Sequence, residues 1–230
     1  MKKKAEALLS GLKERIEFMA EIGSDFIFLP DTALPAVPAE SPAKADILDG
    51  LREKIRACRL CPLAAGRIQA VPGEGHPDAE LMFVGEAPGR DEDIQGRPFV
   101  GRAGQLLTRI IEAMKFRREE VFIVNVIKCR PPENRTPQRE EVGKCQAYLL
   151  AQIRTIRPRV IVALGKVSTD FFQPSTLAMG ELRGRFFEFE GIPVMPTFHP
   201  AYVLRNEGNK DVKKLVWQDM QNVMALLGKK

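Results

Sequence analysis

Four cysteines in this sequence have a spacing that could build a metal site. Cys58 and Cys61 form a C-x2-C pair before Pro62, whereas Cys129 ends an apolar run and Cys145 follows 16 residues later. Four thiols without a spare, in a chain that we expect to work in the cytoplasm, favour metal ligation over disulfides. Four unrelated buried thiols are the alternative. Zinc and a [4Fe–4S] cluster both accept four thiolates, and the long gap between the second and third cysteine favours iron–sulfur over a compact zinc ribbon.

A glycine-rich stretch after a short apolar run could bind a ligand. The run 81–84 predicts a buried strand because it is brief, unbroken and flanked by turn-forming residues. The next residues are Gly85, Glu86, Ala87, Pro88 and Gly89. This loop would lie at the carboxyl edge of a sheet, where open α/β sheets bind ligands and where glycine lets backbone N–H groups come close. An ordinary turn is the alternative, but GRPFVGRAG at 96–104, with an aromatic residue between two tight turns, favours ligand binding.

Two polar side chains follow other expected strands. Asn125 lies at the exit of the run 121–126, and its amide offers a donor and an acceptor together, which is the pattern that reads an imide edge. A turn-forming asparagine is the alternative. His199 is one of two histidines, and Pro200 after it marks a rigid turn. A lone histidine is commonly structural, but this one would lie at the same sheet edge as the glycine-rich loop.

Alternating helices and strands must position these groups. Periodicity predicts helices over 46–57, 102–115, 138–156, 166–173 and 210–227, and strands over 81–84, 121–126 and 159–164. Residues 185–189 and 192–197 have the pattern of a hairpin. The alternation predicts a three-layer α/β/α sandwich with a central, mostly parallel four-stranded sheet.

Residues 1–44 have the pattern of an appendage to this domain. Apolar residues recur at helical spacing between 8 and 19, and four prolines between 30 and 42 favour an extended linker. We therefore expect an N-terminal helix and Pro-rich linker over 1–44 and the main domain over 45–230. Docking on the domain, partner binding and dimerisation are all open for this helix.

Composition limits the class of protein. A chain of 230 residues with 44% hydrophobic content can bury one sizeable core. No apolar run approaches the length of a membrane span, and the basic start lacks the apolar region of a secretory signal. Residues 1–49 carry 6 Lys or Arg and 9 Asp or Glu, whereas residues 50–230 carry 29 and 21. A basic domain favours a polyanionic partner.

Together these pieces resemble the family 4 uracil-DNA glycosylases, the iron–sulfur class of the uracil-DNA glycosylase superfamily. The matching elements are the four cysteines, GEAPGRDED at 85–93, GRPFVGRAG at 96–104, NVIKCRPPENRTP at 125–137 and HPAYVLR at 199–205. They occur in the family's order over roughly residues 50–225, and five elements make the match specific. Residues 1–44 lie outside it, and Arg90 stands where the family often has an acid.

The resemblance implies an enzyme that flips uracil out of DNA, hydrolyses its N-glycosidic bond and leaves an abasic site. It assigns catalysis to His199, Asn125 and Glu92, and the pocket wall to Gly85, Glu86, Ala87, Pro88 and Phe99.

Each of these positions has an implied task. Phe99 would stack on the base, backbone N–H groups of the first loop would contact its carbonyls, and Asn125 would bond N3–H and O4. Glu92 would fill the space beside C5, so that a thymine methyl would clash. His199 would stabilise negative charge at O2 of the departing base. Because Ala87 replaces an aspartate of better-known superfamily members, the activation of the water is open among DNA phosphates, Glu92 and bound water.

The family also implies a [4Fe–4S] cluster on the four cysteines and a DNA interface. The cluster would be structural and would hold the loop after Cys129 against DNA. Phosphate contacts are expected from Arg97, Arg102, Lys128, Arg130, Arg135 and Arg205. The wedge into the gap left by the flipped base is expected from Tyr202, Val203 and Leu204. We expect a monomer acting on single- or double-stranded uracil-containing DNA, with a non-catalytic DNA-binding protein and a redox iron–sulfur protein as alternatives.

Overall fold

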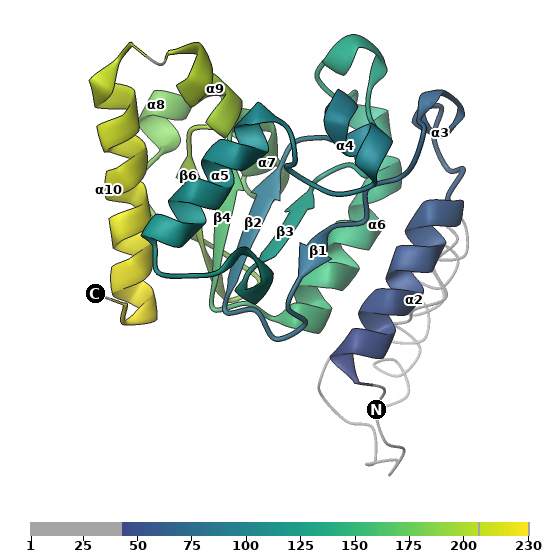
Figure 1. Cartoon of the computed structure of the whole chain (residues 1–230), viewed down its shortest axis with the longest axis horizontal. Coiled ribbons are helices and arrows are strands. Elements are labelled where there is room, and N and C mark those ends of the chain that lie inside the picture. Colours follow the sequence, from purple (N-terminus) through teal and green to yellow (C-terminus); the bar gives the residue numbers. More distant parts are fainter. Residues whose placement is uncertain (1–42, 207, 230) are drawn as a thin grey trace, which may run out of the picture. The chain divides into compact units, whose positions relative to one another are not determined.

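The computed structural model describes residues 43–206 and 208–229, and the expected N-terminal helix and nearly all of its linker lie outside these ranges. A six-stranded sheet in the order β1-β3-β2-β4-β6-β5 lies between two layers of helices (Figure 1). The three-layer α/β/α architecture predicted from the sequence is therefore confirmed, but the sheet has six strands rather than the expected four. No helix of the described residues is long and apolar enough to cross a membrane.

The centre of the sheet consists of four parallel strands. These are β2 (Leu81–Gly85), β3 (Phe122–Asn125), β4 (Val160–Leu164) and β6 (Ile192–Thr197). Their side chains are nearly all buried, as expected for strands covered on both faces. The hairpin is also confirmed, because β5 (Phe187–Phe189) pairs antiparallel with β6. β1 (Glu74–Gly75) adds an antiparallel edge strand that is too short for any sequence period to reveal.

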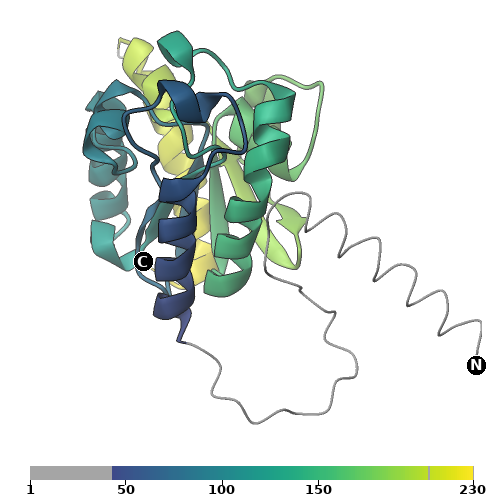
Figure 2. The same cartoon turned by 90° about the vertical axis from the view of Figure 1, so that its right-hand side faces the viewer.

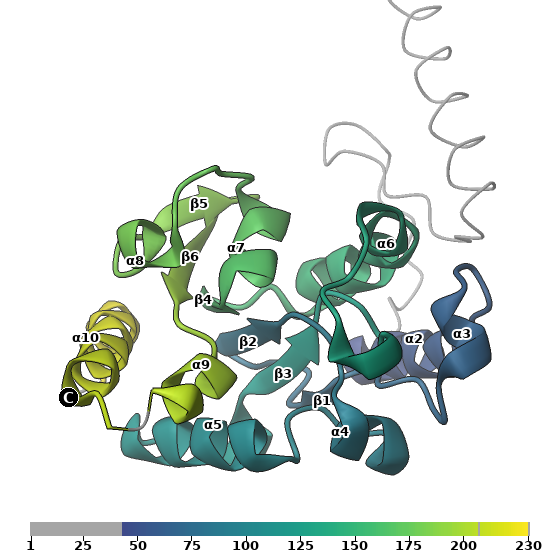
Figure 3. The same ribbon diagram turned by 90° about the horizontal axis from the view of Figure 1, so that it is seen from above.

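Long helices cover both faces of the sheet. Seen from above, α5 (Arg102–Ala113) lies on one face, and α6 (Arg139–Ile156) and α7 (Lys166–Phe172) lie on the other (Figure 3). α10 (Lys210–Leu227) packs beside β6, and α2 (Lys44–Ala57) lies along α6 (Figure 2). All five helices lie within a few residues of their predicted bounds. The short elements were not predicted; they are α3 (Leu63–Gly66), α4 (Arg90–Gln95), α8 (Met179–Leu182), α9 (Pro200–Arg205) and the 3-10 turns η1 (Arg118–Glu120) and η2 (Pro132–Asn134).

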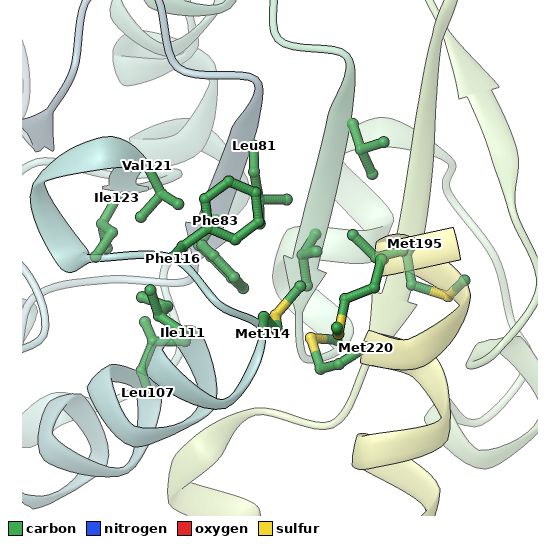
Figure 4. Close-up of a cluster of buried hydrophobic side chains, with 14 of the residues drawn as sticks. Leu81, Phe83, Leu107, Ile111, Met114, Phe116, Val121, Ile123, Met195 and Met220 are labelled. Atoms are coloured by element: carbon green, nitrogen blue, oxygen red, sulfur yellow. The ribbon is translucent and has the colours of Figure 1, made fainter. Parts of the chain in front are cut away.

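One large apolar cluster holds α5 and α10 to the sheet. Leu107 and Ile111 of α5 reach Phe83 of β2, while Met220 of α10 lies near Met195 of β6 (Figure 4). All five side chains are fully or almost fully buried. Truncation of such a side chain to alanine typically costs about 2–5 kcal/mol. This core makes the carboxyl edge of the sheet a rigid base for the loops that leave it.

A buried ion pair fixes the last of these loops. The carboxylate of Asp219 on α10 accepts hydrogen bonds from the Arg183 guanidinium and, at 2.6 Å, from the Thr197 hydroxyl at the end of β6. Asp219 is fully buried, and the Arg183 side chain is 11% exposed. Asp219, held in place by Arg183, therefore joins α10 to Thr197, the last residue of β6 before the loop that carries His199.

We expect Asp219→Ala to destabilise the protein by about 3–5 kcal/mol, because it leaves the Arg183 cation buried without its partner. Urea denaturation of the variant measures this loss. Asp211→Ala, at an exposed position of the same helix, is the matched control and should change stability by less than about 1 kcal/mol. A loss of similar size in both variants would contradict the role of the buried pair.

Candidate active site

A cavity of about 530 Å³ opens at the carboxyl edge of the parallel strands. Loops that follow β2, β3 and β6 form its walls, together with the 97–101 segment. The residues that line it are Glu86, Ala87, Pro88, Gly89, Glu92, Phe99, Ala103, Asn125, Pro131, Asn134, Arg135, Thr136, His199, Ala201 and Arg205. The fold therefore brings the glycine-rich loop, the aromatic residue, the asparagine and the histidine to one place.

The floor of the cavity explains why β2 ends in glycine. Gly85 pairs in register with Asn125 on β3, and a Cβ atom at Gly85 would overlap both the Asn125 side-chain oxygen and the Phe99 ring. Asn125 is 2% exposed, and its Oδ1 is buried without a hydrogen-bond partner among the residues that the structure describes. An unpaired buried oxygen is costly unless a ligand donor satisfies it. This geometry supports the base-reading role expected for Asn125.

Phe99 is held in a strained position beside His199. Its φ angle is 51°, in the left-handed region, and its ring lies 5.6 Å from the His199 ring, measured between centroids. Gly104 at the start of α5 lets the helix approach the Phe99 backbone, where a Cβ atom would overlap the Phe99 carbonyl. Arg118 donates to the Pro98 carbonyl at 2.6 Å and pairs with Glu74. The ring is therefore fixed from several sides.

Glu92 on α4 joins two walls of the cavity. One carboxylate oxygen accepts the backbone N–H of Gly89 at 3.0 Å, and the other accepts those of Val100 and Gly101, both at 2.9 Å. Charge-assisted hydrogen bonds of this kind are the stronger class. Glu92 lines the cavity as expected, but its carboxylate is engaged in holding the glycine-rich loop to the Phe99 segment.

His199 is the N-cap of α9 and is fixed as a neutral imidazole. Its Nδ1 accepts the backbone N–H of Ala201 at 3.1 Å. Burial, together with the smaller effect of the Arg205 guanidinium, lowers the pKa of His199 to about 4, and the Glu92 carboxylate opposes this fall. A neutral ring whose Nδ1 accepts must carry its proton on Nε2. The side chain therefore presents one N–H donor, which suits a developing oxyanion.

Glu86 offers a side chain that the sequence analysis did not assign. Only the backbone N–H of Glu86 was expected to contact the base, but Glu86 is also one of the residues that line the cavity. Burial raises the pKa of the Glu86 carboxyl above its ordinary value of 4.5. Within residues 43–206 and 208–229, this carboxylate has no hydrogen bond or ion pair. A carboxyl group with a shifted pKa in a cleft is a candidate for acid–base chemistry.

The expected basic residues divide into available and engaged groups. Arg135 and Arg205 line the cavity, and Arg102 is exposed at the start of α5. Arg135 pairs with Glu141 and Arg97 pairs with Glu74, so both are partly neutralised. These positions remain candidates for phosphate contacts, as does Arg130, which is half-buried and donates to Asn134 at 2.7 Å.

Two expectations for the DNA interface are wrong. Lys128 is 1% exposed, and its ammonium points into the protein, so it is not available for a phosphate. Val203 is 3% exposed and packs in an apolar cluster with Val212 and Val216 of α10, so it cannot act as a wedge. The wedge is therefore restricted to Tyr202, which is exposed and stacks on Phe198, and to the half-buried Leu204.

The four cysteines lie around a second, small cavity on the α2 side of the sheet. Cys58 and Cys61 follow α2, Cys129 follows β3, and Cys145 lies on α6; all four are free thiols. In the part of the chain that the structure describes, no group of three or more His, Cys, Asp or Glu side chains is arranged so that it could hold a metal ion.

Cationic groups lie beside these thiols. The Arg67 guanidinium donates to the Cys129 sulfur at 2.8 Å, and to the carbonyls of Arg56 and Cys58 at 2.7 and 2.9 Å. Lys128 lines the same cavity. Positive charge beside a set of thiols fits an anionic metal–thiolate centre, which is the chemistry expected from the spacing.

Comparison with known proteins gives consistent matches. The model of the uracil DNA glycosylase superfamily matches residues 72–221. The chain is 44% identical to a type-4 uracil-DNA glycosylase of Thermotoga maritima, over 81% of this chain and 97% of that protein. It is 45% identical to a type-4 enzyme of Saccharolobus solfataricus, over 80% and 88% of the two chains. It is 48% identical to one of Pyrobaculum aerophilum, over 69% and 85%.

Proposed function

Because the chain belongs to the uracil DNA glycosylase superfamily and is a uracil-DNA glycosylase of DNA repair, we propose that it acts by flipping uracil into the cavity described above. There it hydrolyses the N-glycosidic bond, releases free uracil and leaves an abasic site. The observation that carries this proposal is the buried, unpaired oxygen of Asn125 beside the fixed rings of Phe99 and His199. A flipped uracil would satisfy that oxygen with its N3–H.

The chemical step follows from the residues around the base. Phe99 stacks on the ring, and the backbone of the glycine-rich loop contacts its carbonyls. As the bond breaks, negative charge develops on the base, and the Nε2–H of His199 donates to O2. The His199 ring is already fixed by the hydrogen bond that its Nδ1 accepts from the Ala201 backbone N–H. The Nε2–H donor therefore needs no reorganisation during the reaction.

Glu86 is our candidate for the group that acts on the sugar side. Some superfamily members have an aspartate at the position of Ala87, and the neighbouring Glu86 is a half-buried residue whose carboxylate has no hydrogen bond or ion pair within the described residues. In its ionised form this group would orient the water and favour the cationic sugar. General base catalysis of this kind typically contributes about 10²–10⁴ in rate.

The pH dependence of the reaction tests this role. Since the pKa of Glu86 is raised, the rate should fall as the pH drops through that raised value, at higher pH than for an ordinary carboxyl. His199, with a pKa of about 4, stays neutral throughout the pH range in which Glu86 takes up its proton. Glu86→Gln should be slower by about 10²-fold and should lack the acidic fall. An acidic fall that persists in the variant would assign it to another group.

We also propose that Cys58, Cys61, Cys129 and Cys145 hold a [4Fe–4S] cluster. The shared cavity and the neighbouring cations support it. The cluster supplies no step of the hydrolysis; its ligands would tie the end of α2 to the loop after β3, which also carries Arg130 and Arg135.

Protein purified without oxygen should be brown and contain about four irons per chain. Cys145→Ala should lose iron and stability together. A colourless protein with stoichiometric zinc would contradict the proposed cluster. It would not by itself contradict the glycosylase activity, because the cluster supplies no step of the hydrolysis.

The basic test of the proposed function is release of free base from DNA. An oligonucleotide with one uracil should yield free uracil and an abasic site, whereas matched thymine and cytosine oligonucleotides should not. Binding without release would favour a non-catalytic DNA-binding protein.

A further inference from the structure

α7 is a short helix that the mechanism above does not use, although it begins between two strands that lead to the cavity. Its N-cap is Gly165, the residue directly after β4, and β4 lies between β2 and β6 in the sheet. β2 leads into the glycine-rich loop, and β6 leads into the loop that carries His199. The first turn of α7 is therefore placed to contact the ends of both neighbouring strands.

A side chain of this turn holds the end of β2. The hydroxyl of Ser168 donates to the Val84 backbone carbonyl at 2.7 Å, and Ser168 is fully buried. Val84 precedes Gly85, the first residue of the glycine-rich loop, and the pairing of β2 with β4 ends at Val84 and Ala163. Ser168 therefore extends the attachment of β2 on the β4 side, at the point where the loop begins.

The cap of the same turn holds the end of β6. The backbone N–H of Gly165 donates to the Thr197 carbonyl at 2.8 Å, two residues before His199. Gly165 has a φ angle of 88°, which favours glycine, and a Cβ atom there would lie 3.0 Å from the Cβ of His199. Carbon atoms in ordinary contact lie about 3.5–4.0 Å apart. His199 therefore packs directly against the start of α7.

The two contacts are rigidly connected, because Gly165 and Ser168 lie in one closed helical turn. The Gly165 carbonyl accepts both the backbone N–H of Thr169, at 3.0 Å, and its hydroxyl, at 2.9 Å. Thr169 is 1% exposed, so the turn is closed inside the protein. The turn therefore links the loop that contacts the carbonyls of the base to the side chain that donates to its O2.

We propose that Ser168 is a positioning residue that sets the glycine-rich loop at the correct distance from His199. This inference rests on the proposed function, in which the loop contacts the carbonyls of uracil and His199 donates to O2. Displacement of substrate-positioning groups by about 1 Å can cost about 10²-fold in rate. The loop also stays attached to β3, because the Gly85 carbonyl accepts the Val126 N–H at 2.9 Å. Loss of the Ser168 hydroxyl should therefore cause a smaller displacement and a smaller loss of rate.

The primary test compares Ser168→Ala with Thr169→Val, both at a temperature at which circular dichroism shows them folded. Each variant loses one buried hydroxyl of α7, but the Thr169 hydroxyl bonds to the Gly165 carbonyl and the Met179 sulfur, which lie outside β2. Ser168→Ala should slow single-turnover release of uracil by about tenfold. Its affinity for a duplex with non-cleavable 2′-fluoro-deoxyuridine should be nearly unchanged. Thr169→Val should lower the melting temperature and keep the wild-type rate.

A second comparison distinguishes positioning from a general loosening of the fold. In a His199→Ala background, Ser168→Ala should cause almost no further slowing, because the effects of residues that act through one another are not additive. Equal rates for Ser168→Ala and Thr169→Val would overturn the inference. The same conclusion would follow from a full tenfold slowing by Ser168→Ala in the protein that lacks His199.

A third variant covers the case in which Ser168→Ala does not fold. Ser168→Cys keeps a weaker donor at the same position and takes its place in both comparisons, with a smaller loss of rate expected. Failure of both variants to fold, with Thr169→Val folded, would overturn the positioning role and assign Ser168 to the fold alone. A wild type that releases no uracil would overturn the proposed function, and this inference with it.

Discussion

Replacement of His199 by alanine should slow single-turnover release of uracil by about 10²–10³-fold, which is the usual cost of one lost oxyanion donor. The affinity for uracil-containing DNA should change little, because the hydrogen bond from Nε2 strengthens mainly as charge develops on the base. The Nδ1 contact to Ala201 fixes the ring before substrate arrives, so the loss falls on the chemical step. Rapid-quench kinetics with enzyme in excess measure the rate, and titration with a non-cleavable duplex measures the affinity.

Asn125→Ala is the informative comparison for this variant. Asn125 reads the base before the bond breaks, so its loss should weaken uracil binding and slow the reaction together. Mild and equal rate losses in the two variants would contradict His199 as the dominant catalytic group. Ala87→Asp should then raise the rate if the cavity has room for the carboxylate.

Glu92→Ala should reduce the rate of uracil release by about 10²-fold, because displacement of substrate-positioning groups by about 1 Å has this effect. The substitution leaves the N–H groups of Gly89, Val100 and Gly101 without their acceptor and frees the glycine-rich loop from the Phe99 segment. The steric role expected from the sequence predicts a different result, namely retained uracil activity and weak release of thymine from T:G mismatches.

A neighbouring carboxylate provides the control for Glu92. Asp93 on the same helix is 2% exposed and accepts the backbone N–H groups of Ile68 and Gln69, away from the cavity. Asp93→Ala should therefore lower the melting temperature without a comparable loss of rate. Release of thymine by Glu92→Ala, with uracil activity intact, would restore the steric interpretation.

Periodicity was sufficient to predict the scaffold. The runs that form β2, β3 and β4 are unbroken and apolar, and the apolar spacing of α5 and α10 marks their buried faces. Because the four central strands are parallel, residues at their carboxyl ends had to meet at one edge. That rule predicts that Asn125 and His199 lie at the same edge, and both line the cavity.

Side-chain direction could not be predicted in the same way. Lys128 and Val203 lie in stretches that also contain arginines, and a sequence pattern does not tell which of them turn inward. Glu92 joins two loops only because α4, a six-residue helix too short to show a period, aims its carboxylate between them. The Glu86 carboxylate becomes a candidate once its burial is known.

The central claim is that a flipped uracil is recognised by one set of groups and released by another. Its most direct test follows the fluorescence of 2-aminopurine placed beside uracil, in parallel with rapid-quench cleavage, for wild type and His199→Ala. Fluorescence should rise at the same rate in both proteins, and cleavage should follow quickly only in the wild type. Cleavage without a preceding rise, or a rise that is lost together with cleavage in His199→Ala, would contradict this account.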